Sequence, residues 1–176
     1  KSKPFFLYLS HKGVHAMFEP ARRHKNKYAN IPVICPPSMY LTVTDSSKTI
    51  GTVTAPQTRV NYRDIPQWVR NQRYSWHGVD YLYHGAMEFE SFYRSYLETL
   101  QAVDESIEKV IEWVKANGLE ENTMVMYMGD NGFSFGEHGL IDKRHAYEES
   151  MRVPMLVWAP GMVKPSSVLD QVVMNV

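Results

Sequence analysis

Residues 124–161 read MVMYMGDNGFSFGEHGLIDKRHAYEESMRVPMLVWAPG. This stretch decides the fold because a polar loop joins two short apolar runs, residues 124–128 and residues 154–159. Apolar runs of that length bounded by turn signals are typical of strands buried in a sheet. The first run is followed by Gly129, Asp130 and Asn131, so the sequence predicts two oxygen-bearing side chains at the end of a buried strand.

A long amphipathic helix is predicted before this stretch. From Glu88 to Asn117, apolar residues recur at three- and four-residue steps and form one stripe, which is suited to packing in a core. Gly118 follows and suits a C-terminal cap, because glycine readily adopts the left-handed conformation found there. Upstream, the apolar run at residues 5–10 predicts another strand, covered on both faces.

The order strand, helix, strand, loop, strand predicts an α/β fold with a mainly parallel sheet flanked by helices. In such sheets, binding sites gather beyond the carboxyl ends of the strands. Residues 16–87 show little periodicity and contain prolines that interrupt regular structure. Aromatic residues in that region argue against simple disorder.

The composition is that of a soluble globular protein, with 176 residues, 44% hydrophobic and 22% charged. The formal net charge is zero, so nothing predicts binding to nucleic acid or to an anionic membrane surface. No apolar run is long enough to span a bilayer. The single cysteine excludes an internal disulfide. Because the sequence opens directly into a predicted strand without an initiator methionine, we expect an internal fragment of a longer protein.

Asp130 and Asn131 supply a carboxylate and an amide oxygen, which are ligands for calcium or magnesium rather than zinc. By itself, Asp-Asn-Gly is most often only a turn. Two ligands also fall short of the roughly six to eight oxygens that calcium takes.

The order and spacing of these residues resemble the formylglycine-dependent sulfatases of the alkaline phosphatase superfamily. The resemblance rests on Asp130-Asn131, on Lys143 a dozen residues later, and on the flanking apolar runs. It extends to residues 3–10 and to the helix, and only residues 20–85 lack it. It implies an alkaline-phosphatase-like sheet, with residues 1–176 as the central part of one catalytic domain that is incomplete at both ends. Residues 16–87 would then be a long variable insertion on the substrate side.

The resemblance also implies an activity, which is hydrolysis of a sulfate ester on a carbohydrate. Asp130 and Asn131 would bind Ca²⁺, and the hydrate of a formylglycine would attack sulfur. The family makes formylglycine from the cysteine of a Cys-x-Pro-x-Arg sequence, using a formylglycine-generating or sulfatase-maturating enzyme. Cys35-Pro36-Pro37-Ser38-Met39 has methionine where arginine is required, so we assign Cys35 no catalytic role. With the nucleophile outside the chain, the fragment alone is expected to be inactive.

Two residues are expected to act on the sulfate directly. By resemblance, Lys143 holds the sulfate and His15 protonates the leaving alcohol. Read without the family, Lys143 would be a solvated surface residue and His15 a strand-end histidine bonded to backbone. Four further residues are candidates for substrate contact, and they are Lys12, His138, Arg144 and His145.

Several side chains near this loop are expected to be structural. Glu148, Glu149 and Arg152 are predicted to form an ion-pair network that positions the loop. His138 is equally compatible with substrate contact and with bracing the loop. His77 lies in no motif and is predicted only to sit in a loop.

Two alternatives to a sulfatase stay open at this stage. A phosphate or phosphonate ester hydrolase of the same superfamily could use the same metal ligands and cations, although Asp-Asn in place of Asp-His favours sulfate. A catalytically inactive relative that binds sulfated glycans is the other alternative. Family members that remove sulfate from polysaccharides are mostly exported, so the resemblance implies a periplasmic, secreted or lysosomal protein.

Overall fold

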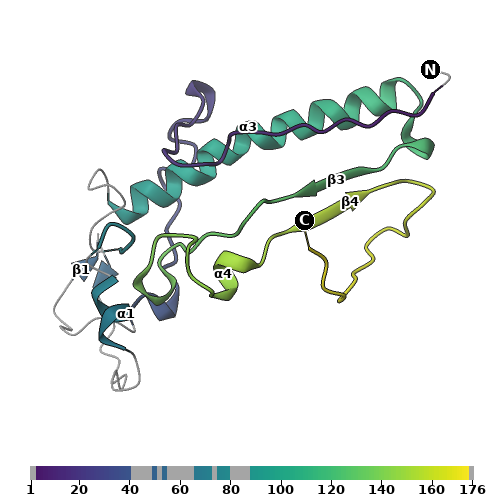
Figure 1. The fold of residues 1–176 in the computed structure, drawn as a ribbon. Helices are drawn as coiled ribbons and strands as arrows, with labels where there is room; N and C mark the ends of the chain where they lie inside the picture. Colours follow the sequence, from purple (N-terminus) through teal and green to yellow (C-terminus); the bar gives the residue numbers. More distant parts are fainter. Residues whose placement is uncertain are drawn as a thin grey trace.

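The computed structural model describes residues 3–40, 49–50, 53–54, 66–72, 75–79 and 88–174. One long helix, α3 (Phe89–Ala116), spans much of the molecule (Figure 1). It buries Val103 and Val114 from the predicted apolar stripe, together with Phe89 and Phe92 in its first turn, and it ends before Gly118, which has φ 62°. The predicted helix and its glycine cap are therefore confirmed.

Strands β3 (Val125–Met128) and β4 (Met155–Trp158) form where the two apolar runs predicted them, but they pair antiparallel, with residue 125 opposite residue 158. The expected parallel arrangement is thus wrong for this pair. A parallel connection needs a crossover of a dozen or more residues, usually helical. The connection here, residues 129–154, is long enough for a crossover, but its helices are only the short turns η5 (Glu137–Gly139) and α4 (Glu148–Met151).

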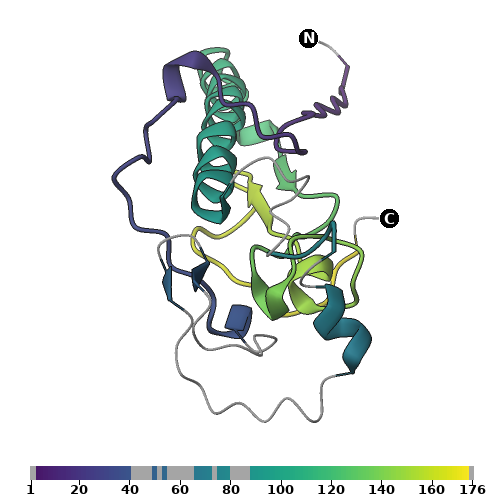
Figure 2. The same ribbon diagram turned by 90° about the vertical axis from the view of Figure 1, so that its left-hand side faces the viewer.

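The strand predicted at residues 5–10 is absent from the structure. This segment is not part of a sheet in the structure, and Phe6 is 87% exposed. It leads into residues that lie along α3, where the ring of His11 hydrogen-bonds Ser106 Oγ at 2.8 Å (Figures 1 and 2). An apolar run becomes a buried strand only when neighbouring strands and helices cover it. The described residues provide no such cover.

A compact aromatic core joins the start of α3 to the loop that follows β3. Its buried members are Phe18, Met39, Val79, Phe89, Phe92 and Ile141. The ring centroids of Tyr96 and Phe135 lie 4.5 Å apart, so the aromatic residues of the helical stripe pack in the core, as predicted. Cys35 also packs against this core.

Short elements complete the described structure. They are η1 (Arg22–His24), η2 (Pro37–Tyr40), β1 (Thr49–Ile50), β2 (Val53–Thr54), α1 (Gln67–Gln72), η4 (Glu120–Asn122) and η5 (Glu137–Gly139). Strands β1 and β2 pair antiparallel. Much of the predicted insertion at residues 16–87 lies outside the described residues. In the part of the chain that is described, no helix has the length and apolarity to cross a membrane.

Candidate active site

The turn after β3 carries the predicted metal ligands. The backbone N–H of Asn131 donates to Asp130 Oδ1 at 2.9 Å, a local contact between adjacent residues. The Asn131 side chain donates through Nδ2 to the carbonyl of Gly132 at 2.7 Å. Because Nδ2 is committed to a carbonyl, Asn131 Oδ1 is the atom left to act as an acceptor or a ligand.

Lys143 contacts this turn through a hydrogen bond. Its Nζ donates to Asn131 Oδ1 at 3.0 Å, and the contact is partly buried. The structure therefore brings the predicted sulfate-holding lysine to the predicted metal ligand. Lys143 is not a freely solvated side chain, and its ammonium group donates to a neutral amide oxygen, which does not itself cancel the charge.

Gly132 fixes the turn against α4. Its N–H donates to the carbonyl of Ser150 at 2.9 Å. A Cβ at this position would lie 2.1 Å from the carbonyl oxygen of Glu149, a distance that real atoms do not tolerate. Glycine is thus required for the close approach of the two backbones, and this approach holds the Asp130-Asn131 turn in place.

The loop between η5 and α4 holds a buried carboxylate that the sequence reasoning missed. Asp142 is only 2% exposed, and its Oδ1 accepts a hydrogen bond from Arg144 Nη1 at 2.9 Å. His77 Nδ1 lies 3.2 Å and His145 Nε2 lies 3.9 Å from Asp142 Oδ2. These two are ion-pair distances without good hydrogen-bond geometry, so Arg144 is the firmest partner of Asp142.

Two of the predicted substrate contacts, Arg144 and His145, therefore share Asp142 as a partner. The run Asp142-Lys143-Arg144-His145 offered a hint of this cluster, since a single acid stands beside three basic residues. Nothing in the sequence pointed to His77, because its contact with Asp142 spans 65 positions along the chain.

His138 braces the loop. Its ring stacks on Tyr147, with centroids 3.9 Å apart and an interplanar angle of 15°, and its Nε2 lies 3.7 Å from Glu149 Oε2. These contacts fit the bracing interpretation, while its contact with substrate stays a prediction. Arg152 Nη1 pairs with Glu148 Oε1 at 3.3 Å, which supplies part of the predicted ion-pair network.

His15 and Lys12 lie in an exposed segment beside α3. His15 Nδ1 lies 2.7 Å from the carbonyl oxygen of Ala16. Since a carbonyl only accepts, Nδ1 must carry the proton in this contact. No hydrogen bond or ion pair among the described residues links either side chain with Asn131 or Lys143, so the structure does not bring them together with that pair.

Asp130 and Asn131 fit part of a calcium site. Both offer hard oxygens, and Asp130 is exposed to an incoming ion. Within the described residues, no group of three or more His, Cys, Asp or Glu side chains is placed to hold a metal. The further oxygens that calcium needs would therefore have to come from elsewhere.

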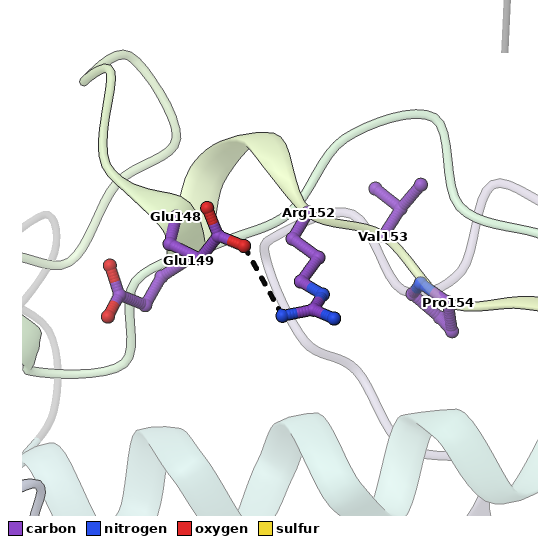
Figure 3. Close-up of a pocket in the computed structure, with 5 residues that line it drawn as sticks. All are labelled: Glu148, Glu149, Arg152, Val153 and Pro154. Atoms are coloured by element: carbon purple, nitrogen blue, oxygen red, sulfur yellow. Dashed lines mark hydrogen bonds and ion pairs between the residues drawn. The ribbon is translucent and has the colours of Figure 1, made fainter. Parts of the chain in front are cut away.

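A hollow lies next to this site, on α4. Its lining residues are Glu148, Glu149, Arg152, Val153 and Pro154, and Figure 3 shows the ion pair of Arg152 with Glu148 among them. The lining includes neither the Asp130-Asn131 turn nor Lys143. The candidate site is thus defined by its contacts.

Comparison with known proteins identifies the family. The family model described as Sulfatase matches residues 1–175. The chain belongs to the sulfatase family. Among its relatives, the N-acetylglucosamine-6-sulfatase of Capra hircus is 27% identical over 99% of this chain. The N-acetylglucosamine-6-O-sulfatase of Bacteroides thetaiotaomicron is 38% identical over 51% of it.

A solved structure of BT4656 in complex with its substrate D-glucosamine-2-N, 6-O-disulfate is similar with a TM-score of 0.57 and 22% identity, over 86% of this chain and 38% of that one. This likeness shows a shared fold and, with the family match, agrees with the expected sulfatase architecture. The chain spans only 27% of the length of the goat relative and 16% of the bacterial one.

Proposed function

We propose that the protein containing this chain is a sulfuric ester hydrolase that removes sulfate from a sulfated carbohydrate. The observation that carries the proposal is the contact of Lys143 Nζ with Asn131 Oδ1 at 3.0 Å, directly after β3, in a member of the sulfatase family. It joins a fixed positive charge to a turn with two hard oxygen ligands, which is a suitable arrangement for holding a tetrahedral anion.

Asp130 and Asn131 would hold Ca²⁺, which when bound supplies Lewis-acid polarisation of the sulfate oxygens. Lys143 binds the same oxygens from the protein side. Its hydrogen bond to a neutral amide positions the ammonium group without cancelling its charge, so it needs no rearrangement as negative charge develops.

His15 is the proposed general acid. Because its Nδ1–H is engaged by the carbonyl of Ala16, Nε2 is the atom that would deliver a proton to the leaving alcohol from the doubly protonated ring. Lys12, His138, Arg144 and His145 are proposed to contact the substrate. Among the three that follow η5 or lie in it, Arg144 is the most exposed, with 63% of its side chain exposed against 29% for His138 and 17% for His145.

The nucleophile is proposed to be the hydrate of a formylglycine outside this chain, and a formylglycine-generating or sulfatase-maturating enzyme would form that formylglycine. We also propose that residues 1–176 are the central part of a larger catalytic domain, with residues 16–87 as a substrate-side insertion. The exposure of apolar residues supports this view, since Phe6 is 87% and Leu156 is 63% exposed. Other segments of the protein would cover them and complete a mainly parallel sheet.

The substrate is proposed to carry a 6-O-sulfated glucosamine unit. The names of the goat and Bacteroides relatives specify N-acetylglucosamine 6-sulfate, and the solved neighbour binds a glucosamine 6-O-sulfate. An exported location is proposed because a Drosophila melanogaster relative, 40% identical over 46% of this chain, is named an extracellular sulfatase.

A phosphate or phosphonate ester hydrolase is the second candidate. It is favoured by the same cations, because Lys143 and Arg144 would hold any tetrahedral anion of that size. An inactive glycan-binding relative would show binding without turnover.

The test is sulfate release from glucosamine 6-sulfate by the full-length, maturation-competent protein. We expect release that stops on chelation of divalent ions and returns with Ca²⁺. The Asp130→Ala variant should show no calcium-dependent release, because it lacks the charged ligand, whereas Asp170→Ala in the exposed C-terminal segment should behave as wild type. Near-normal turnover by Asp130→Ala would remove Asp130 from the site.

A further inference from the structure

One buried carboxylate has no part in the reaction outlined above. Asp142 is 2% exposed and lies among three basic side chains, Arg144, His145 and His77. A buried carboxylate costs several kcal/mol unless it is paired, and even a paired one is weak evidence of a stabilising role. The position of this carboxylate therefore suggests another reason for its presence.

The backbone around Asp142 is held without its side chain. Its carbonyl accepts the N–H of Ser134 at 2.8 Å, and the neighbouring Ile141 N–H donates to the carbonyl of His77 at 2.7 Å. A bridge between Gly78 and Leu140 joins the same two segments. The loop is thus anchored by main-chain bonds, and the carboxylate is left to orient the side chains around it.

Arg144 is the side chain that the carboxylate controls most directly. One nitrogen, Nη1, is bound to Asp142 Oδ1 at 2.9 Å, while 63% of the side chain remains exposed. A guanidinium group is planar and rigid, so anchoring one nitrogen limits the orientations that its other donors can take. His77 Nδ1, at 3.4 Å from the same Nη1, flanks it.

We propose that Asp142 is a positioning residue that orients Arg144, with His77 beside it, to bind oxygen atoms of the sulfated carbohydrate. This inference rests on the proposed function, since it names a part of the same substrate site. Asp142 itself does not touch the substrate. His77 becomes part of the site through this arrangement, although it lies 67 positions from Arg144.

The test is a double-mutant cycle in the full-length protein, using Asp142→Asn, Arg144→Ala and the pair. We expect Asp142→Asn to raise KM for glucosamine 6-sulfate about tenfold and to change kcat less than about threefold, because it weakens binding through Arg144. In the Arg144→Ala background, the same substitution should change KM less than about twofold. Asp104→Asn, an exposed carboxylate on α3, is the matched control and should leave both constants unchanged.

Independent, multiplicative effects of the two substitutions would overturn the inference, as would a fall in kcat at unchanged KM. Calorimetry on the same variants gives the Kd of glucosamine 6-sulfate for each, so the double-mutant cycle can also be calculated for binding alone. A wild-type protein that binds this sugar but releases no sulfate would defeat the proposed function, while the Kd cycle would still decide on Asp142. Absence of binding would overturn both.

Thermal melting identifies a folding defect in Asp142→Asn. If that variant fails to fold, His77→Gln provides a second test of the inference. We expect His77→Gln to raise KM about threefold, and the effect should vanish in the Arg144→Ala background. An unchanged KM in His77→Gln would exclude His77 from the site. An equal effect with and without Arg144 would contradict action through that residue.

Discussion

At the scale of single residues, the chemistry of the site depends on how Lys143 is held. A lysine paired with a carboxylate would present little net charge to an incoming sulfate, whereas the amide oxygen of Asn131 orients the ammonium group and leaves its charge available. The same amide is a proposed calcium ligand, so one side chain couples the two positive centres that the reaction would use.

Replacing Lys143 with alanine in the full-length protein should cost at least about 2–4 kcal/mol of transition-state stabilisation, in line with the loss of an oxyanion donor. This loss appears as a fall in kcat/KM for sulfate release. Steady-state kinetics measure this loss. Lys164→Ala, an exposed lysine far along the chain, is the control and should be silent. A loss below about tenfold for Lys143→Ala would mean that the lysine is ordinary surface.

The residue types near Asp130 were predictable because a resemblance could be read from their order and spacing. The contact between Lys143 and Asn131 fits that expectation. The cluster around Asp142 was not predictable, since His77 reaches it from a segment without any motif. Long-range contacts of this kind depend on the fold and leave no local pattern.

At the scale of elements, the site depends on the close approach of the turn after β3 to α4. Gly132→Ala should lower the melting temperature, because the new Cβ meets backbone atoms and overpacking of this kind costs about 1–3 kcal/mol. Gly129→Ala is the matched control, since a Cβ there would meet its nearest neighbours at 3.5–3.6 Å, an ordinary contact. Equal melting temperatures for the two variants would show that the turn can move away from α4.

The short helix η1 is attached to α3 through Glu105, which pairs with Arg23 and lies 2.9 Å from His24 Nε2. The hydrogen bond from Arg23 holds the pKa of the Glu105 carboxyl below its usual value, and the charges of Arg23 and His24 add to the effect. Stability from a carboxyl with a lowered pKa is present above the unfolded value of about 4.3 and is lost as pH falls through the folded value.

We therefore expect the attachment of η1 to weaken only in acid below about pH 4.3. An NMR titration of the Glu105 carboxyl measures this directly and should give a midpoint below that of a model peptide. In Arg23→Gln the midpoint should return towards the model value. A midpoint that is the same with and without Arg23 would contradict the pairing.

Local patterns account for the elements that were predicted correctly. The apolar stripe of α3 and the runs that became β3 and β4 are each encoded within a few neighbouring residues. The pairing direction of β3 and β4 could not be predicted in this way. It depends on the path that residues 129–154 take between the two strands, and no local sequence pattern encodes that path. The run at residues 5–10 has the composition of a buried strand but finds no strand partner among the described residues.

At the scale of the whole molecule, we propose that this chain carries only part of the chemistry. It contributes two proposed metal ligands and a cation, and it contains no Cys-x-Pro-x-Arg sequence from which a formylglycine could form. The purified 176-residue chain should therefore release no sulfate from glucosamine 6-sulfate, even with Ca²⁺ and a maturation enzyme present. Ion chromatography of the reaction measures this, and any enzyme-dependent release would refute the assignment of the nucleophile to another part of the protein.

The most direct measurement of the central claim compares two esters of the same sugar. The full-length protein would be assayed with glucosamine 6-sulfate and glucosamine 6-phosphate, and kcat/KM determined for each. We expect sulfate release to be favoured by at least about a hundredfold, which corresponds to about 2.7 kcal/mol of discrimination in the transition state. Faster release of phosphate would contradict the assignment as a sulfatase and support the phosphoesterase, and turnover of neither ester would support a glycan-binding relative.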